Sequence, residues 1–148
     1  MAEVSRALAL GSKFDFKDKT YDVSPWTYGI QGEFEKYLEH SARKEAVAFQ
    51  GILNNDAVFA KLLKEVHGEI SSGVFRFGGQ KFAEAIQSPA HIPYLFLLCL
   101  KVKHKEVTME LVQEMCKENM QGIVDAMAQA NEDPNENGVA TTDQVVAP

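Results

Sequence analysis

At 148 residues, the chain has the length of one domain with a single hydrophobic core. Hydrophobic residues make up 45% of it and charged residues 24%, which is typical of a soluble globular protein. The net charge of −6 argues against binding to nucleic acid, because Lys and Arg are dispersed and outnumbered by Asp and Glu.

The cysteines and the apolar runs argue against a disulfide-linked, a secreted and a membrane-spanning protein. Cys99 and Cys116 form neither a disulfide framework nor a paired ligand motif, and they are compatible with a reducing cytoplasm. The N-terminal sequence MAEVSRALAL lacks the apolar core and basic flank of a signal peptide. The strongest apolar run, IPYLFLLCL from Ile92 to Leu100, is far shorter than the roughly 20 residues of a membrane-spanning helix, so a buried core helix is expected there.

Residues 13–24 predict a small β-hairpin. Aromatic and β-branched residues alternate with polar ones along both strands, and Lys17-Asp18-Lys19 form the turn. On this interpretation two apolar residues of each strand face one another: Phe14 and Phe16 from the first strand, Tyr21 and Val23 from the second.

A first amphipathic helix follows the hairpin. Ser24-Pro25 is a plausible helix entry, but Gly29 and Gly32 weaken a helix this early, so it is expected to begin near Thr27 or Gln31. Apolar residues then recur at helical spacing as far as Phe49.

A second helix is expected after a break at residues 51–55, with Asn55 or Asp56 as its N-cap and Ser71-Ser72-Gly73 at its end. Its apolar stripe consists of Val58, Phe59, Leu62, Leu63, Val66 and Ile70.

Residues 74–77 predict a short extended segment, and residues 81–87 a short helix. An apolar helix over residues 94–102 should have Pro93 in its first turn, since a proline deep inside would cost about 3 kcal/mol. The last helix is predicted to be the longest, beginning after a Thr108 cap and ending at Asn131.

The chain therefore predicts a mainly α fold: a single helical domain over residues 1–130 that includes the N-terminal hairpin. Residues 131–148 predict a disordered acidic tail, because four acidic and no basic residues accompany few apolar anchors.

We find no convincing catalytic, metal-binding or nucleotide-binding motif. The four histidines lack partners at zinc-binding spacing and are interpreted as exposed or capping residues. Both cysteines lie in apolar patterns typical of core residues. The Gly78-Gly79 pair lacks the Lys-Ser/Thr of a phosphate-binding loop and is interpreted as a turn. The sequence thus predicts no enzyme, cofactor or metal site.

Two groups of residues are candidates for binding a partner protein. Four methionines lie in the last helix, and thioether side chains adapt to varied apolar partners; the alternative, which we favour, is that they fill this protein's own core. An aromatic group at the start of the first helix could form an interface or pack against the hairpin. The partner-binding candidates are Trp26, Tyr28, Met109, Met115, Met120 and Met127.

Two blocks of the sequence resemble the tail assembly chaperones of long-tailed bacteriophages. The first block is FDFKDKTYDVSPWT followed by GEFEKYLEH at residues 32–40. The second is SSGVFRFGGQKFAEAIQSP at residues 71–89 followed by YLFLLCLKVKHKEVTMELV at residues 94–112. The order of hairpin, helix, small aromatic segment, short helix, apolar helix, charged turn and final helix is similar to that of the family.

The resemblance implies a non-enzymatic protein of the host cell cytoplasm that binds the tape-measure protein, or another tail protein, and keeps it soluble during tail assembly. It implies no nucleic-acid or membrane partner and allows a homo-oligomer. Two alternatives remain open at this point: a structural virion component such as a tail-completion or neck protein, and a secretion-type chaperone or adaptor.

Overall fold

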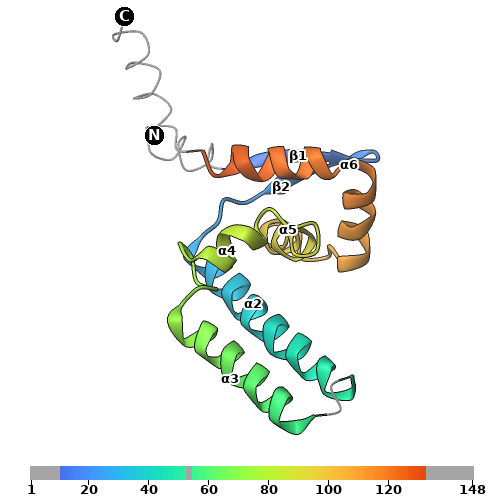
Figure 1. The fold of residues 1–148 in the computed structure, drawn as a ribbon. Coiled ribbons are helices and arrows are strands. Elements are labelled where there is room, and N and C mark those ends of the chain that lie inside the picture. Colours follow the sequence, from blue (N-terminus) through green and yellow to red (C-terminus); the bar gives the residue numbers. More distant parts are fainter. Residues whose placement is uncertain (1–10, 53–54, 133–148) are drawn as a thin grey trace, which may run out of the picture. The chain divides into compact units, whose positions relative to one another are not determined.

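The computed structural model describes residues 11–52 and 55–132 (Figure 1). Within them the fold is mainly helical, with five α-helices and an N-terminal two-stranded antiparallel hairpin, which confirms the predicted fold class. The described chain divides into two compact units. Unit 1 contains the hairpin and the residues from Pro93 onwards, and unit 2 runs from Tyr28 to Ile92.

The hairpin of unit 1 consists of β1 (Ser12–Phe16) and β2 (Lys19–Val23). Phe14 pairs with Tyr21 in the antiparallel register, so the predicted apolar residues share one sheet face, and all four are buried. Lys17 occupies the loop with a φ of 51°, a left-handed conformation that costs a non-glycine residue about 1 kcal/mol. The predicted hairpin is therefore confirmed, with its ends shifted by one residue.

The buried face of the hairpin packs in unit 1 with α5 (Ile92–Lys101) and α6 (Met109–Ala130). The rings of Phe14 and Phe96 meet edge to face with centroids 5.3 Å apart. The backbone N–H of Ser24 donates to the carbonyl of Cys99 at 3.1 Å, which ties the end of the hairpin to α5. Each large side chain buried in this core contributes about 1.5–3 kcal/mol.

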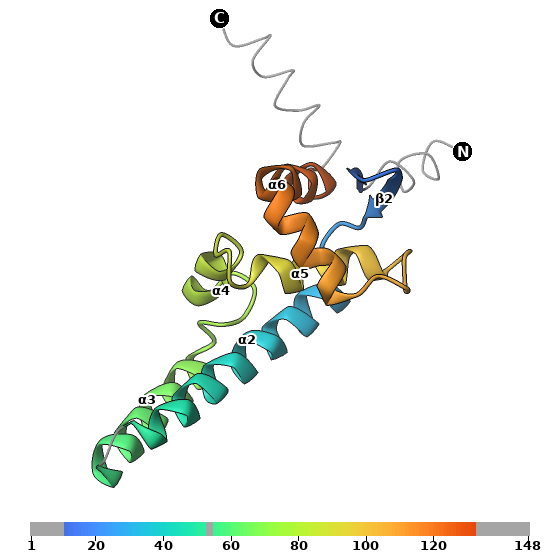
Figure 2. The ribbon, with the colours of Figure 1, turned by 90° about the vertical axis from the view of Figure 1, so that its right-hand side faces the viewer.

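Helix α6 begins as predicted, because the hydroxyl of Thr108 accepts the backbone N–H of Leu111. It is kinked at Asn119, whose φ of −155° and ψ of 65° are not helical. The Asn119 side chain accepts the N–H of Gly122 at 2.9 Å and so caps the second segment. The bend is visible in Figures 1 and 2, and the sequence pattern alone did not predict it.

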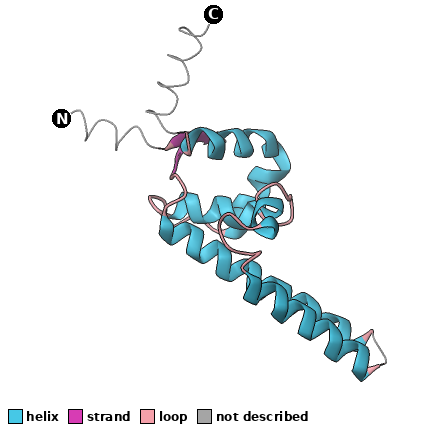
Figure 3. Cartoon of the chain, turned by 60° about the vertical axis from the view of Figure 1, so that its left-hand side comes forward, coloured by secondary structure: helices cyan, strands magenta, loops and turns pink. Residues whose placement is uncertain are grey.

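Unit 2 contains α2 (Tyr28–Ala48), η1 (Phe49–Gly51), α3 (Asp56–Ser72) and α4 (Gln80–Ala85). Figure 3 shows α2 and α3 side by side, as a helical hairpin joined at one end. The Asn55 side chain accepts the N–H groups of Ala57 and Val58, so Asn55 is the predicted cap of α3. Gly73 ends α3 in a left-handed conformation with a φ of 83°.

One local prediction is wrong. Residues 74–77 are not extended: they form turns, and the carbonyl of Val74 accepts the N–H groups of Lys81 and Phe82 at the start of α4. Ser24-Pro25 does not begin α2, since the Ser24 hydroxyl donates to the carbonyl of Pro25 and the helix starts only at Tyr28. The alternative start near Thr27 is thereby confirmed.

The predicted boundary between a domain of residues 1–130 and a tail of residues 131–148 falls at the end of α6. Asn131 caps that helix, and its side-chain oxygen accepts the backbone N–H of Trp26 at 2.7 Å. Residues 133–148 lie outside the described part of the chain. The single domain and the disordered tail stay predictions.

Candidate functional site

An apolar groove lies within unit 2, between α2, α3 and the region around α4. Its volume is about 390 Å³. Apolar side chains from both long helices and from the turn before α4 form its walls, and they are Leu38, Ala42, Ala46, Phe49, Leu62, Val66, Phe75 and Ala85. Polar side chains complete the lining: Ser41, Glu45, Glu69, Lys81, Glu84, Ser88 and His91.

The helical period of α2 creates one wall of the groove. Leu38, Ala42 and Ala46 recur every four residues and therefore lie above one another on one face. The two alanines keep this wall low, while Leu38 and Ala46 are themselves buried. Only Ala42 of these three residues is partly exposed, so this wall is open to the groove mainly at Ala42.

Helix α3 forms the opposite wall and is the least covered helix of unit 2. The helix is amphipathic and carries the predicted apolar stripe. None of its 17 residues is buried, however. Leu62 and Val66 line the groove and remain partly exposed. The junction of the two helices adds exposed apolar side chains, with Phe49 at 43% and Ile52 at 72% of full exposure. Unit 2 thus leaves one side of α3 open.

Aromatic packing joins the N-terminal half of α2 to α4. Phe34 is fully buried, and its ring meets that of Phe82 from α4 edge to face at 5.4 Å. Phe77 packs on Phe82 in the same manner, and its backbone N–H donates to the Glu35 carboxylate at 2.8 Å. These contacts attach α4 to α2 and leave α3 as the helix with an uncovered face.

His91 is the titratable group with the most enclosed surroundings in the groove. The Tyr37 hydroxyl lies 3.0 Å from Nδ1 of His91, and the two rings meet edge to face at 5.5 Å. Burial lowers the pKa of His91 below its usual 6.5, while the nearby Glu45 carboxylate opposes this shift. His91 is consequently neutral at pH 7.

The remaining charges of the groove are mostly acidic. Lys81 lies 4.0 Å from Glu84, its neighbour on the same helix, so these two charges offset each other. Glu45 and Glu69 lie on opposite walls, and both are exposed. Neither takes part in an ion pair with a lysine or arginine among the residues that the structure describes. An apolar floor is thus flanked by two acidic side chains.

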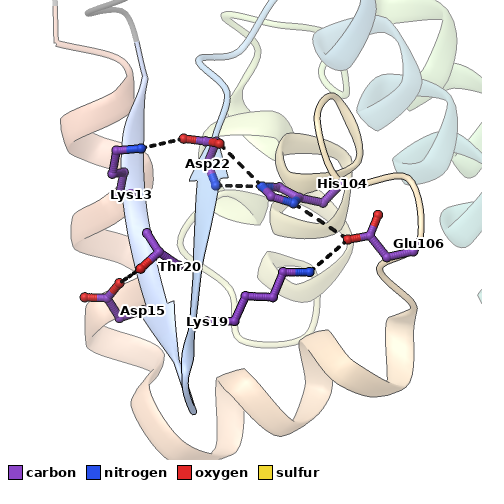
Figure 4. Close-up of polar contacts among 7 residues, drawn as sticks. All are labelled: Lys13, Asp15, Lys19, Thr20, Asp22, His104 and Glu106. Carbon is purple, nitrogen blue, oxygen red and sulfur yellow. Dashed lines mark hydrogen bonds and ion pairs between the residues drawn. The ribbon is translucent and has the colours of Figure 1, made fainter.

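A second polar cluster lies in unit 1, where β2 meets the loop between α5 and α6 (Figure 4). The backbone N–H of Asp22 donates to Nε2 of His104 at 2.9 Å. Nδ1 of the same ring faces Glu106 at 3.7 Å, and Lys19 reaches Glu106 at 3.1 Å. His104 therefore links the loop to the hairpin.

The carboxylates of this cluster are held ionised. The hydrogen bond from Lys13 lowers the pKa of Asp22, and a hydrogen bond from its own backbone, followed by that from Lys19, lowers the pKa of Glu106. The Asp22 side chain is partly exposed and that of Glu106 largely exposed, and exposed ion pairs contribute little to stability. The cluster fixes a loop against a strand.

The predicted partner-binding methionines are distributed between core and surface. Met115 and Met127 are buried in unit 1, in agreement with the alternative that they fill this protein's own core. Met109 and Met120 are partly exposed on α6. The helix does not present all four on one open face.

The predicted aromatic candidates also differ from each other. Tyr28 is 92% exposed at the start of α2. Trp26 is partly buried, and its indole interacts with the buried thiol of Cys99. Burial raises the pKa of Cys99 to about 12, so no thiolate forms there at neutral pH. Partner binding through Trp26 or Tyr28 stays a prediction.

Two of the four histidines are not the exposed residues that the sequence suggested. His91 and His104 are both partly buried and hydrogen-bonded. His91 directly precedes the apolar run of α5, which was the available sign of its burial. No sequence pattern indicated the groove, because residues on three separate segments line it.

No protein-family model, curated protein or solved structure matches this chain. In the described residues, no helix is both long and apolar enough to span a membrane. The same part of the chain contains no group of three or more His, Cys, Asp or Glu side chains that could hold a metal ion.

Proposed function

We propose that this chain is a binding protein that covers an apolar helix of a partner, and that it serves as a tail assembly chaperone of a long-tailed bacteriophage. In that role it binds the tape-measure protein in the host cytoplasm and keeps it soluble until the tail is assembled. The proposal involves binding through the groove of unit 2 and no catalysis.

The observation that carries this proposal is the incompletely covered apolar stripe of α3. Helices in a folded domain normally bury their apolar stripe, and α3 has such a stripe without a single buried residue. The apolar groove between α2 and α3 is of the kind into which amphipathic helices bind through side chains spaced three and four residues apart.

The resemblance of about residues 13–130 to the tail assembly chaperones supports the more specific role. A tape-measure protein is long and helical, and its apolar stripes are exposed until a tail forms around it. A helix-binding groove is suited to covering such a stripe, and the overall negative charge of −6 favours solubility of the complex.

Co-expression with the tape-measure protein of the same genome tests the proposal. We expect the natural chain to increase the soluble fraction of that protein and to co-purify with it. Val66→Glu places a charge on the groove wall and should weaken binding roughly 10- to 100-fold, because the carboxylate loses water in the complex. Val66 is partly exposed, so the variant should fold, which circular dichroism checks.

Val124→Glu is the matched control. Val124 is 36% exposed on α6, in unit 1. Its substitution makes the same chemical change, from valine to glutamate, near the partly exposed Met120. Unchanged binding of this variant supports the groove, whereas loss of binding only in this variant would place the partner on α6. A partner that gains no solubility from the natural chain would contradict the chaperone role, and recovery of the chain from purified virions would favour a structural component.

A further inference from the structure

We infer that the groove of unit 2 takes an amphipathic helix of a partner protein whose apolar stripe is flanked by Lys or Arg. The inference rests on the proposed function and adds the chemistry of the partner. It follows from the length of the groove and the sign of the charges beside it.

The dimensions of the groove match about three turns of helix. The wall formed by α2 and the start of η1 extends from Leu38 to Phe49, and at about 1.5 Å per residue this corresponds to roughly 16 Å. Three turns present apolar side chains at positions i, i+3 or i+4, i+7 and i+8. A helix in this position would complete a three-helix arrangement with α2 and α3.

The acidic side chains on the groove walls favour basic residues beside the apolar stripe of the bound helix. Glu45 lies on the α2 wall one turn from Ala42, and Glu69 lies on the α3 wall one turn from Val66. Lys81 is offset by Glu84, and neutral His91 adds no positive charge. A bound helix with Lys or Arg beside its stripe would meet a carboxylate on each side, whereas Asp or Glu there would be repelled.

Three synthetic helical peptides with an identical apolar stripe test the inference against the full chain. They carry Lys, Gln or Glu at the flanking positions, and binding is measured by fluorescence anisotropy. We expect the Lys-flanked peptide to bind about tenfold more tightly than the Glu-flanked one at low salt, since each exposed carboxylate contributes a few-fold. The difference should shrink at about 1 M salt, where the Debye length is only ~3 Å.

A variant with reversed charges on both walls tests whether Glu45 and Glu69 cause this preference. In the double variant Glu45→Lys and Glu69→Lys the preference should invert, so that the Glu-flanked peptide binds more tightly. The double variant Glu39→Lys and Glu118→Lys changes the net charge equally at positions that do not line the groove, and it should keep the natural preference.

The outcomes separate the inference from the proposed function. Equal binding of all three peptides would overturn the inference and leave helix binding intact. Binding of none would contradict the proposed function itself. A concentration-dependent dimer that Val66→Glu dissociates, and with which the peptides do not compete, would show that the groove takes a second copy of this chain and would also overturn the inference.

Discussion

At the scale of single residues, His91 shows how a side chain acquires a property that its sequence neighbours do not reveal. Its ring contacts Tyr37, which lies three positions after the buried Phe34 and on a different segment of unit 2. Burial lowers the pKa of the imidazole, so the folded state favours the neutral ring.

This shift predicts a pH dependence of stability. As the pH falls below the ordinary pKa of 6.5, the unfolded chain takes up the His91 proton before the folded chain does. The free energy of unfolding should therefore be highest above pH 6.5 and decrease as the pH falls from 6.5 towards the folded pKa. Urea denaturation at a series of pH values should show a shallower decrease for His91→Gln than for the natural chain.

The variant Tyr37→Phe distinguishes burial from hydrogen bonding as the cause of the lowered pKa of His91. This variant removes the hydroxyl at 3.0 Å from His91 but keeps the ring that covers it. We expect most of the pH dependence to persist, since desolvation is the main cause of the shift. A flat profile for Tyr37→Phe would assign the effect to the hydrogen bond instead.

At the scale of elements, the kink in α6 separates two helical segments that a continuous apolar pattern joins. Asn119 leaves the helical conformation and caps the second segment through Gly122. A Cβ atom on Gly122 would approach the Asn119 amide nitrogen to 2.2 Å, so the cap requires glycine at this position. The bend thus depends on a pair of residues three positions apart.

A double-mutant cycle tests this pair. Asn119→Ala should lower stability by about 1 kcal/mol through loss of the cap. Gly122→Ala should be close to neutral on its own, because a gain in helix propensity of about 1 kcal/mol is offset by displacement of the Asn119 side chain. In the Asn119→Ala background the same change should stabilise the chain by about 1 kcal/mol.

Urea denaturation of the four chains measures these differences. The expected coupling between the two sites is about 1 kcal/mol. Additive effects would mean that the Asn119 side chain does not cap the second segment.

Helix α3 illustrates the limit of pattern analysis at the same scale. Its apolar stripe, its Asn55 cap and its end at Gly73 were all predictable, because each depends on residues that are close in sequence. The pattern could not tell whether another element covers the stripe. Coverage depends on where α2 and α4 lie, and in unit 2 they leave one side of α3 open.

At the scale of the whole molecule, the described residues distribute burial unevenly between the two units. The second segment of α6 contains Ile123, Ala126, Met127 and Ala130, all of them buried, whereas α3 contains no buried residue. Local stability follows burial, since helices with few buried contacts open more readily.

Hydrogen exchange of the full chain should therefore differ between these helices. We expect the amides of α3 to exchange faster than those of the second segment of α6, because α3 has fewer buried contacts to lose on opening. Mass spectrometry of peptides covering each helix measures the rates. Binding of a helical peptide should slow exchange in α3 selectively. Equally slow exchange in both helices of the free chain would indicate that α3 is already covered.

The sequence by itself determined the helical class, the hairpin, the caps at Asn55 and Thr108 and the approximate helix ends. These features follow from periodicity and from hydrogen bonds between residues a few positions apart. Only the tertiary structure decided that Met115 and Met127 are buried, that His91 lies under Tyr37, and that α2 and α3 enclose a groove. Burial and cavities depend on which distant segments meet, and a one-dimensional pattern does not contain that information.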